Sequence, residues 1–370
     1  MPHLRVLPTA TAAFMPDGAL PSEVAGAVRT GGRVYLGAVS GEGDATAQTN
    51  QAMDAIESAL AAAGAAPSDL AQLRVALVDR AHQADVLAVI ARRLPHGIAP
   101  AISSVIYAGL PMPEQVVQIS ADAVVGAASA PARELFTEEA SSIEVAGRGP
   151  LDAAAQADRA LTNLAARLAA GGSSMADVCK ITVQITDRAY RTAVYNVIGK
   201  HFRGIHPVST GLIVSALSRP ESLVAIDMHV LRGAHDRLRK YHSNAVRYGF
   251  SQQPLDCDFC MAVRTGRHVV LRGQTGTDLS EKMHGAGDAA AQAGQAMENV
   301  GLLLGEAGAS VSDVTRATVY VTDRAYLAPV TEVVLKRLSG VAPAFRALIV
   351  KGLASPDLLM EVDITAETDG

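Results

Sequence analysis

The chain has 370 residues, 49% hydrophobic and 19% charged, which excludes an intrinsically disordered protein because disorder needs low hydrophobicity and high net charge. No apolar run reaches the ~18 residues of a membrane span, and the first residues lack the basic start and apolar core of a signal peptide. A net charge of −5 disfavours nucleic-acid binding, and three cysteines are too few for a disulfide scaffold, so we expect a cytoplasmic protein.

Matched landmarks recur three times along the chain. The triplet Asp-Arg-Ala occurs at residues 79–81, 187–189 and 323–325, and each is followed by a Pro about 20 residues later and by a Leu ten residues after that Pro. This spacing indicates three copies of one unit. We place the copies at residues 1–128, 129–240 and 241–370. The surplus length lies in a loop near Gly276–Gly287 and in a polar connector around Leu231–Asp256.

The periodicity predicts the same elements in each copy. In chain order, the first copy has a strand at Val34–Leu36, a helix at Ala47–Ala63, a strand at Leu73–Val78 and a helix at Ala84–Arg93. The second has Ile143–Val145, Ala154–Ala170, Ile181–Thr186 and Ala193–Phe202, and the third has Val269–Leu271, Ala289–Ala307, Ala317–Thr322 and Pro329–Leu338. Two final strands complete a ββαβαββ unit, an α+β fold with helices on one face of its sheet. The other face needs covering, which suggests that three units close around a pseudo-three-fold axis.

The repeats resemble the Rid family, also called YjgF, RidA-like or L-PSP-like proteins. The matching phrases are Ala27–Gly31 with Val34–Leu36 and Ala262–Gly266 with Val269–Gln274, together with the Ala-Gly helix ends and the Pro-to-Leu segments. The third repeat matches best, and the second has a degraded N-terminal hairpin. Family members are usually homotrimers with ligand clefts between neighbours. The resemblance therefore implies a chorismate-mutase-like fold, with an intramolecular pseudo-trimer around a central β-barrel and outer helices.

Deaminating members of this family hydrolyse enamines and imines without a cofactor or metal, and hold the substrate carboxylate with an Arg two residues after the Pro. This chain has Ile102, Ser209 and Phe345 at that position. Arg346 is one residue late, and a one-residue offset in a strand points to the opposite face unless a bulge intervenes. The missing Arg argues against ordinary 2-aminoacrylate deaminase activity.

The family's second polar site is a Glu in the last strand, which the third repeat keeps as Glu361. The other repeats have Gln118 and Ala225 there, so we expect a single working site with Glu361 as acid and base. An apolar cleft would raise the pKa of this carboxyl group. The alternative is that Glu361 is a surface residue of an edge strand.

The turn after the second strand lines the cleft in the family. Here Arg148 or Arg272 is a candidate replacement for the missing carboxylate clamp, and Gly147 or Gly273 is a candidate oxyanion donor. The alternative for each Arg is a solvated turn residue. The full set of substrate-binding candidates is Arg272, Gly273, Gln274, Arg148, Gly147, Arg346, Phe345, Phe259 and Ser209. Phe259 is either a lid over the substrate or a packing residue.

The sequence offers no metal site, because Cys257–Cys260 forms a single CxxC and zinc sites need four ligands. We therefore predict a cofactor-independent hydrolase or deaminase acting on a small imine, enamine, amide or related carbonyl compound in one inter-repeat cleft. A chorismatase-type hydrolase or lyase shares the three-repeat architecture and a C-terminal Glu phrase, and is the alternative enzyme. A non-catalytic ligand-binding or interaction protein is the alternative from another class. We expect a small-molecule substrate, no nucleic-acid or membrane partner, and leave further self-association of pseudo-trimers open. Endoribonuclease activity fits poorly with the acidic balance.

Overall fold

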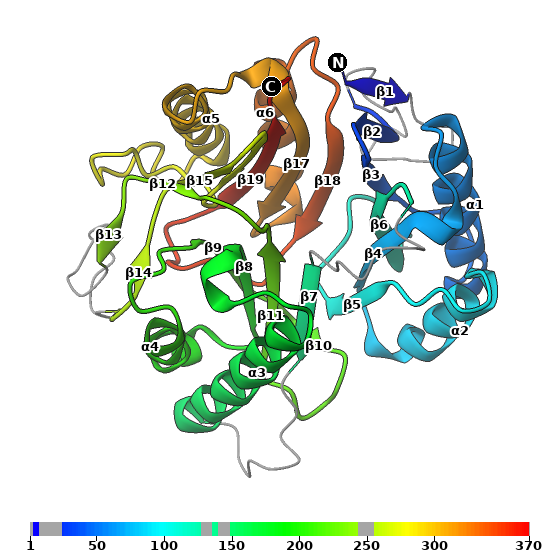
Figure 1. Cartoon of the computed structure of the whole chain (residues 1–370), viewed down its shortest axis with the longest axis horizontal. Coiled ribbons are helices and arrows are strands. Elements are labelled where there is room, and N and C mark those ends of the chain that lie inside the picture. Colours follow the sequence, from blue (N-terminus) through cyan, green and yellow to red (C-terminus); the bar gives the residue numbers. More distant parts are fainter. Residues whose placement is uncertain (1–2, 7–23, 127–134, 140–148, 243–254, 370) are drawn as a thin grey trace.

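The computed structural model describes residues 3–6, 24–126, 135–139, 149–242 and 255–369. Figure 1 shows three lobes around a common centre, formed in turn by the blue-to-cyan, green and yellow-to-red parts of the chain. Helices lie on the outside of each lobe and strands face the centre. No helix in the described ranges is long and apolar enough to cross a membrane.

The first and third repeats have the predicted ββαβαββ order. The first consists of β2 (Ala27–Thr30), β3 (Arg33–Val39), α1 (Ala45–Ala62), β4 (Leu70–Leu77), α2 (Gln83–Arg93), β5 (Ala101–Ile106) and β6 (Val117–Val124), preceded by β1 (Leu4–Val6). The third consists of β15 (Ala262–Thr265), β16 (His268–Leu271), α5 (Ala289–Glu306), β17 (Val314–Val321), α6 (Leu327–Arg337), β18 (Ala344–Ile349) and β19 (Met360–Glu367).

The second repeat keeps the helices, and the described part of its N-terminal region contains one strand. Its elements are β7 (Leu135–Glu139), α3 (Pro150–Ala170), β8 (Val178–Ile185), α4 (Arg191–His201), β9 (Val208–Ile213), β10 (Ala216–Leu217) and β11 (Val224–Val230). The strand predicted at Ile143–Val145 lies outside the described residues. In the connector that follows, β12 (Asp236–Leu238) pairs with β15 of the third repeat, and β13 (Tyr241–His242) pairs with β14 (Asp258–Phe259).

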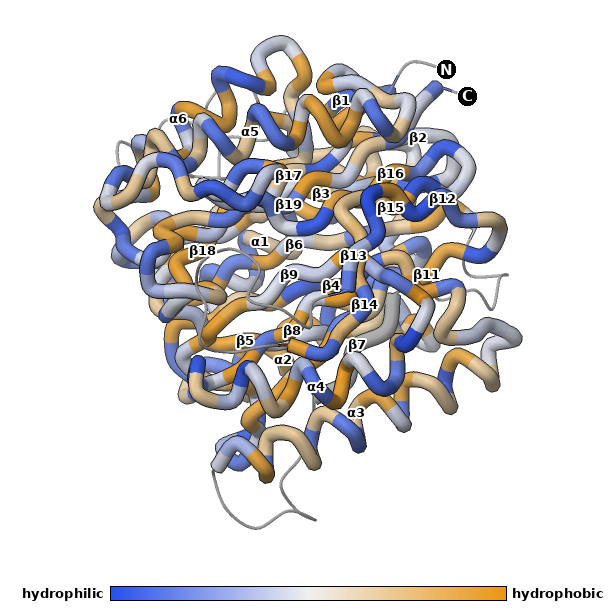
Figure 2. The backbone as a smooth tube through the Cα atoms, turned by 90° about the vertical axis from the view of Figure 1, so that its left-hand side faces the viewer, coloured by the Kyte–Doolittle hydropathy of each residue, from blue (hydrophilic) through white to orange (hydrophobic). Residues whose placement is uncertain are grey.

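The main sheet of each repeat has its strands in the same order. In the third repeat the order is β12-β15-β16-β19-β17-β18, where β17 and β18 are parallel and the other pairs are antiparallel. The helices cover one face, and hydrophobic and hydrophilic residues alternate along α3 and α5 as expected for helices with one buried side (Figure 2). The core on this side is built mainly from Ala, Val, Leu and Ile.

The Asp of each Asp-Arg-Ala triplet starts a short 3-10 turn before the second helix of its repeat. Asp79, Asp187 and Asp323 each accept a hydrogen bond from the backbone N–H two residues on, at 2.8 to 2.9 Å. These Asp residues are therefore turn-forming residues at strand ends.

The Arg of each triplet joins its repeat to the next one in cyclic order, which the sequence analysis did not predict. Guanidinium groups donate to backbone carbonyls from Arg80 to Leu217 (2.9 Å), from Arg188 to Leu353 (3.0 Å) and from Arg324 to Pro111 (2.7 Å). Backbone N–H groups join the same pairs of repeats in the reverse direction, since Ser215 donates to Ile106 (3.0 Å), Lys351 to Ile213 (2.9 Å) and Ala108 to Ile349 (2.9 Å). Each repeat therefore contacts both others through equivalent positions.

The predicted closed β-barrel is not present as one hydrogen-bonded sheet. Over the described ranges the strands form four separate sheets, each with two open ends. Between repeats, β10 pairs with β5 of the first repeat and β12 pairs with β15 of the third, and isolated bridges such as Ala25 to Ala344 add to these contacts.

Candidate active site

Glu361 lies at the boundary between the second and third repeats. It belongs to β19, where it pairs with Tyr320 of β17, and is 5% exposed. Because β19 lies inside the sheet between β16 and β17, the alternative of a surface residue on an edge strand is wrong. The carboxylate is directed at the turn after β16, since a Cβ added to Gly273 would lie 1.7 Å from Glu361 Oε1 and 2.9 Å from Thr210 Oγ1. Only glycine leaves room for the carboxylate there.

The surroundings of Glu361 favour its neutral form. Burial, with a contribution from the nearby charge of Asp363, raises the pKa of its carboxyl group to about 8, against the opposing effects of Arg272, Lys180 and Arg191. A carboxylic acid with a pKa near neutrality can both donate and accept a proton at physiological pH. The predicted rise in pKa therefore has a structural basis in this chain.

Two guanidinium groups from different repeats lie near this acid. The guanidinium carbon of Arg272 is 5.7 Å from the centre of the Tyr241 ring, and that of Arg191 is 5.0 Å from the centre of the Tyr195 ring. Burial lowers the pKa of Arg191, and the charge of Arg272 lowers it further, so the two cations repel each other. Guanidinium groups pair well with carboxylates and other oxyanions, so their place beside Glu361 makes this boundary the candidate site.

The second repeat supplies the opposite wall. Tyr195 is buried on α4, and its hydroxyl lies 3.4 Å from Ser209 Oγ on β9. Ser209 also accepts a hydrogen bond through its backbone carbonyl from the N–H of Gly273, at 3.3 Å. This N–H already has a protein partner, so the structure gives no support for Gly273 as an oxyanion donor. Gln274 fixes the same turn, because its side-chain amide donates to the carbonyl of Arg272 at 2.7 Å.

Phe259 is a packing residue rather than an exposed lid. It is buried, and its ring lies 6.2 Å from the rings of both Tyr195 and Tyr241. Phe259 therefore packs against the two tyrosine rings, Tyr195 and Tyr241, that lie beside the guanidinium groups of Arg191 and Arg272.

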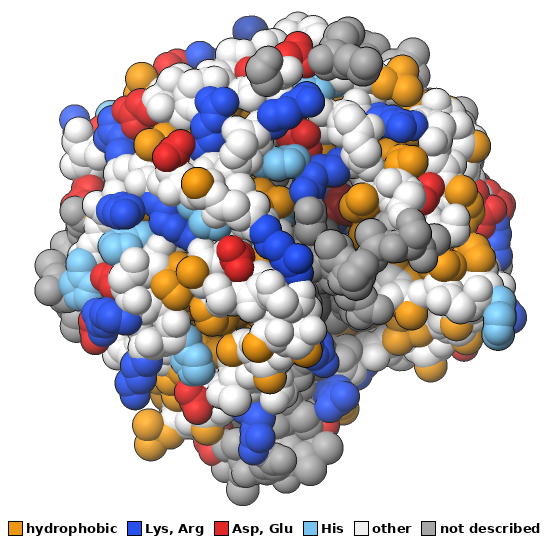
Figure 3. All heavy atoms as spheres, viewed as in Figure 1, with side chains coloured by type: hydrophobic (Ala, Val, Ile, Leu, Met, Phe, Trp, Pro, Cys, Tyr) orange, Lys and Arg blue, Asp and Glu red, His pale blue; other side chains and the backbone are white. Residues whose placement is uncertain are grey.

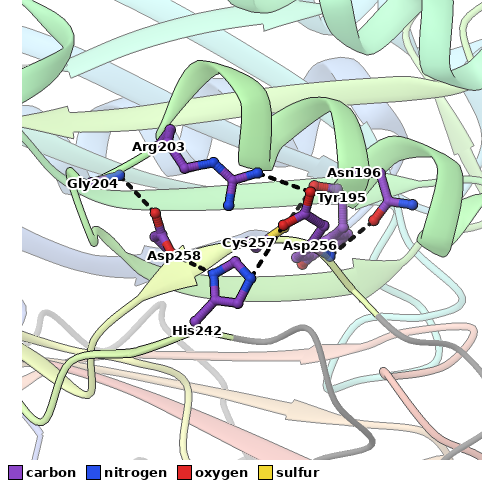
Figure 4. Close-up of polar contacts among 8 residues, drawn as sticks. All are labelled: Tyr195, Asn196, Arg203, Gly204, His242, Asp256, Cys257 and Asp258. Atoms are coloured by element: carbon purple, nitrogen blue, oxygen red, sulfur yellow. Dashed lines mark hydrogen bonds and ion pairs between the residues drawn. The ribbon is translucent and has the colours of Figure 1, made fainter.

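A polar network around His242 joins the connector between the second and third repeats to α4 and the turn that follows it, as Figure 4 shows. His242 contacts Asp258 at 2.5 Å through Nδ1 and Asp256 at 3.2 Å through Nε2. Asp258 accepts from the N–H of Gly204 at 2.7 Å, and Asp256 pairs with Arg203 at 2.8 Å. The network holds the ends of β13 and β14 in place beside the site.

The cysteines of the CxxC segment are structural. Cys257 donates to the carbonyl of Tyr195 at 2.6 Å, and burial raises the pKa of both Cys257 and Cys260 to about 12. A neutral buried thiol is a poor nucleophile and a poor metal ligand. Within the described ranges no group of three or more His, Cys, Asp or Glu residues could hold a metal ion.

The remaining candidates lie elsewhere. Phe345 is fully buried in the core, and Arg346 lines a central cavity rather than the Glu361 site. No bulge interrupts the pairing of β18 with β17. The one-residue offset of Arg346 from the family's Arg position therefore directs its side chain away from the Glu361 site, as expected from the sequence. Gly147 and Arg148 lie outside the described residues.

The other two boundaries lack the acid. Gln118 occupies the position of Glu361 at the boundary of the third and first repeats, and accepts a weak hydrogen bond from Arg346 Nε at 3.4 Å. Ala225 occupies it at the boundary of the first and second repeats and packs in a hydrophobic cluster. A complete acidic site is therefore present at one boundary.

Arg191 and Tyr195 were missed by the sequence analysis. Comparison of the repeats carries a signal for them, because the first repeat has Gln83 and Leu87 at the equivalent positions of its second helix. A charge and an aromatic ring that appear in one copy alone are candidates for a function specific to that copy.

The chain is thus built from three similar α+β units and has a buried Glu at one boundary between them, which is the architecture of a tandem-repeat protein. A model of the family described as Endoribonuclease L-PSP matches residues 23–125, 140–231 and 253–368. The chain belongs to this family, with three tandem copies of its domain, which confirms the predicted Rid resemblance.

Individual relatives match parts or most of the chain. A RutC family protein of Pyrococcus abyssi is 32% identical over 108 residues, covering 29% of this chain and 84% of the relative. Protein DfrA of Myxococcus xanthus is 41% identical over 76 residues, covering 20% of this chain and 57% of the relative. The crystal structure of a chorismatase is similar in fold, with a TM-score of 0.59 at 14% identity over 81% of this chain and 93% of that protein.

Proposed function

We propose that the chain is a cofactor-independent hydrolase that acts on a small, carboxylate-bearing imine, enamine, amide or related carbonyl compound at the boundary of its second and third repeats. The observation that carries this proposal is the buried Glu361, whose pKa of about 8 and two neighbouring guanidinium groups suit proton transfer to a bound anion.

Each side chain has a role in this scheme. Arg272 and Arg191 bind the substrate carboxylate, which places the reacting atoms beside Glu361. For an enamine, protonated Glu361 gives its proton to the β-carbon, and the resulting iminium carbon accepts water. The Glu361 carboxylate takes a proton from that water, and the carbinolamine collapses to a carbonyl compound and ammonia. Glu361 thus ends the first half of the reaction deprotonated and regains its proton in the second.

Chorismatase-type hydrolysis of an enol ether is the second candidate. Protonation of an enol-ether carbon requires the same neutral acid, and two guanidinium groups from different repeats suit a substrate with two carboxylates. The fold similarity to a chorismatase along most of the chain supports this candidate at the level of architecture.

We also propose that the three repeats correspond to the three subunits of homotrimeric relatives, arranged as a pseudo-trimer. The cyclic hydrogen bonds from Arg80, Arg188 and Arg324 support this arrangement.

The described cysteines are all free thiols, which supports a reducing, cytoplasmic location.

The test is a panel of small anionic enamines, imines, cyclic amides and enol ethers, assayed with the wild-type chain, Glu361→Gln and Glu332→Gln. Glu332 lies exposed on α6, so its variant makes the same chemical change away from the site. We expect Glu361→Gln to lose roughly 100-fold or more of kcat and Glu332→Gln to keep wild-type activity. Substrate binding without turnover by the wild type would instead favour a non-catalytic binding protein.

A further inference from the structure

A cavity of about 100 Å³ lies at the centre of the molecule, where all three repeats meet. A buried water needs about 10 to 15 Å³ of such space, so the cavity holds several waters or one small ion. On the face shown in Figure 3, basic, acidic and histidine side chains gather near the middle of the molecule. The charged residues that line the cavity are Arg74, Lys180, Asp227, Arg316, Arg346 and Asp363.

The cations in this cavity outnumber the carboxylates that neutralise them. Arg74 and Arg316, from the first and third repeats, share the single carboxylate of Asp122, which Arg74 contacts at 2.6 Å. Lys180 pairs with Asp363 at 2.7 Å, so that carboxylate is already used. The third carboxylate, Asp227, accepts a hydrogen bond from the side-chain amide of Gln184 at 3.1 Å. Four cations therefore face three carboxylates, which leaves one excess positive charge on the side of the cavity between the first and third repeats.

Arg346 supplies the third guanidinium on that side. It is 7% exposed, and in the described part of the chain its only hydrogen bond is the 3.4 Å contact from Nε to Gln118. Its guanidinium carbon lies 5.9 Å from the centre of the Tyr107 ring. On Arg74, the Nη1 atom has no hydrogen-bond partner among the described residues.

The three guanidinium groups also repel one another. Burial lowers the pKa of Arg316 well below its usual value, and the charges of Arg74 and Arg346 add to this effect. Burial likewise lowers the pKa of Arg346, with Arg74 contributing. Arginine does not lose its proton in proteins, so the repulsion persists unless an anion is bound.

We propose that the central cavity binds a small oxyanion, no larger than inorganic phosphate, between the guanidinium groups of Arg346, Arg74 and Arg316. Guanidinium groups match the oxygens of phosphate, sulfate and carboxylate in pairs of parallel hydrogen bonds. The site is distinct from the Glu361 site and does not depend on the proposed function. Its three guanidinium groups come from the first and third repeats, on β4, β17 and β18.

The test is isothermal titration of the full chain with inorganic phosphate, sulfate, acetate and chloride at matched ionic strength. We expect saturable binding of at least one oxyanion, no saturable binding of chloride, and a rise in Tm that follows the same concentration dependence. The order of phosphate, sulfate and acetate identifies the oxyanion class. No saturable binding of any of the three would overturn the proposal and leave a cavity filled by water.

Arg346→Met and Arg92→Met form the matched pair, because each removes one positive charge and Arg92 lies exposed on α2. We expect Arg346→Met to weaken oxyanion binding at least tenfold and Arg92→Met to leave it unchanged. Equal affinities in the two variants would contradict the assignment. Arg346→Lys keeps the charge but loses the paired geometry, so we expect an intermediate affinity from it. If Arg346→Met does not fold, Arg346→Lys carries the test against Arg92→Met, and an affinity equal to that of Arg92→Met contradicts the proposal.

Discussion

The pKa of Glu361 predicts a pH-dependent difference in stability between the wild type and Glu361→Gln. Burial raises this pKa from 4.5 to about 8. Below pH 4.5 the group is protonated in both the folded and the unfolded chain, so it costs no stability. Between these values the unfolded chain ionises while the folded one stays neutral, and the free energy of unfolding falls as pH rises.

The full shift corresponds to roughly 5 kcal/mol at 1.36 kcal/mol per pKa unit, and water entry into the site would reduce it to about half. The glutamine introduced by Glu361→Gln cannot ionise, so we expect the stability advantage of the variant over the wild type to grow by about 1 kcal/mol per pH unit from pH 5 up to the pKa of Glu361 in the folded chain, and then to level off. Other titrating groups cancel in this difference.

The assay is urea unfolding of the wild type, Glu361→Gln and the control Glu332→Gln at four pH values between 5 and 8. A stability difference between the wild type and Glu361→Gln that stays constant across this range would refute the raised pKa. It would also remove the electrostatic basis of the proposed acid, whatever the substrate.

Three further predictions follow from the contacts. Gly273→Ala should displace the Glu361 carboxylate and lower kcat/KM about 100-fold with little loss of Tm, because a misplacement of about 1 Å can cost that much. Gly294→Ala on α5, where a Cβ meets nothing within 4 Å, is the control, and is expected to gain about 0.5 to 1 kcal/mol in chemical unfolding. Arg188→Met removes a hydrogen bond to the third repeat and should lower the free energy of unfolding by about 1 to 3 kcal/mol, whereas an unchanged value would show that this contact is dispensable. Arg272→Met should raise the pKa of Glu361 and shift the pH–rate profile toward higher pH. An unshifted profile would show that Arg272 is too far from Glu361 to affect its pKa.

The order of elements was predictable because its determinants are local. The Asp at each strand end caps a turn through a hydrogen bond to a residue two positions away, so the sequence pattern and the structure report the same interaction. All six helices were placed correctly, with ends that differ by at most one turn. Glu361 was proposed as the acid from its place in the last strand, and the structure shows that its side chain is buried there.

The composition of the site was less predictable because its parts are distant in sequence. Arg191 and Glu361 come from different repeats, and they meet only because β9 lies beside the turn at Gly273. The role of Arg346 was also out of reach, since the direction of its side chain depends on what fills the centre. The sequence showed that the family's carboxylate-binding Arg was missing, but it did not show that Arg74, Arg316 and Arg346 would line one central cavity.

The cyclic contacts between repeats have a consequence for how this molecule tolerates change. In an assembly of separate subunits, weakening one interface releases a subunit on dilution, so every interface must be strong enough to hold by itself. Here the connectors keep the three repeats at a high effective concentration, whatever the amount of protein present. One boundary can therefore lose affinity without dissociation, which leaves each boundary free to acquire chemistry that a separable assembly could not sustain.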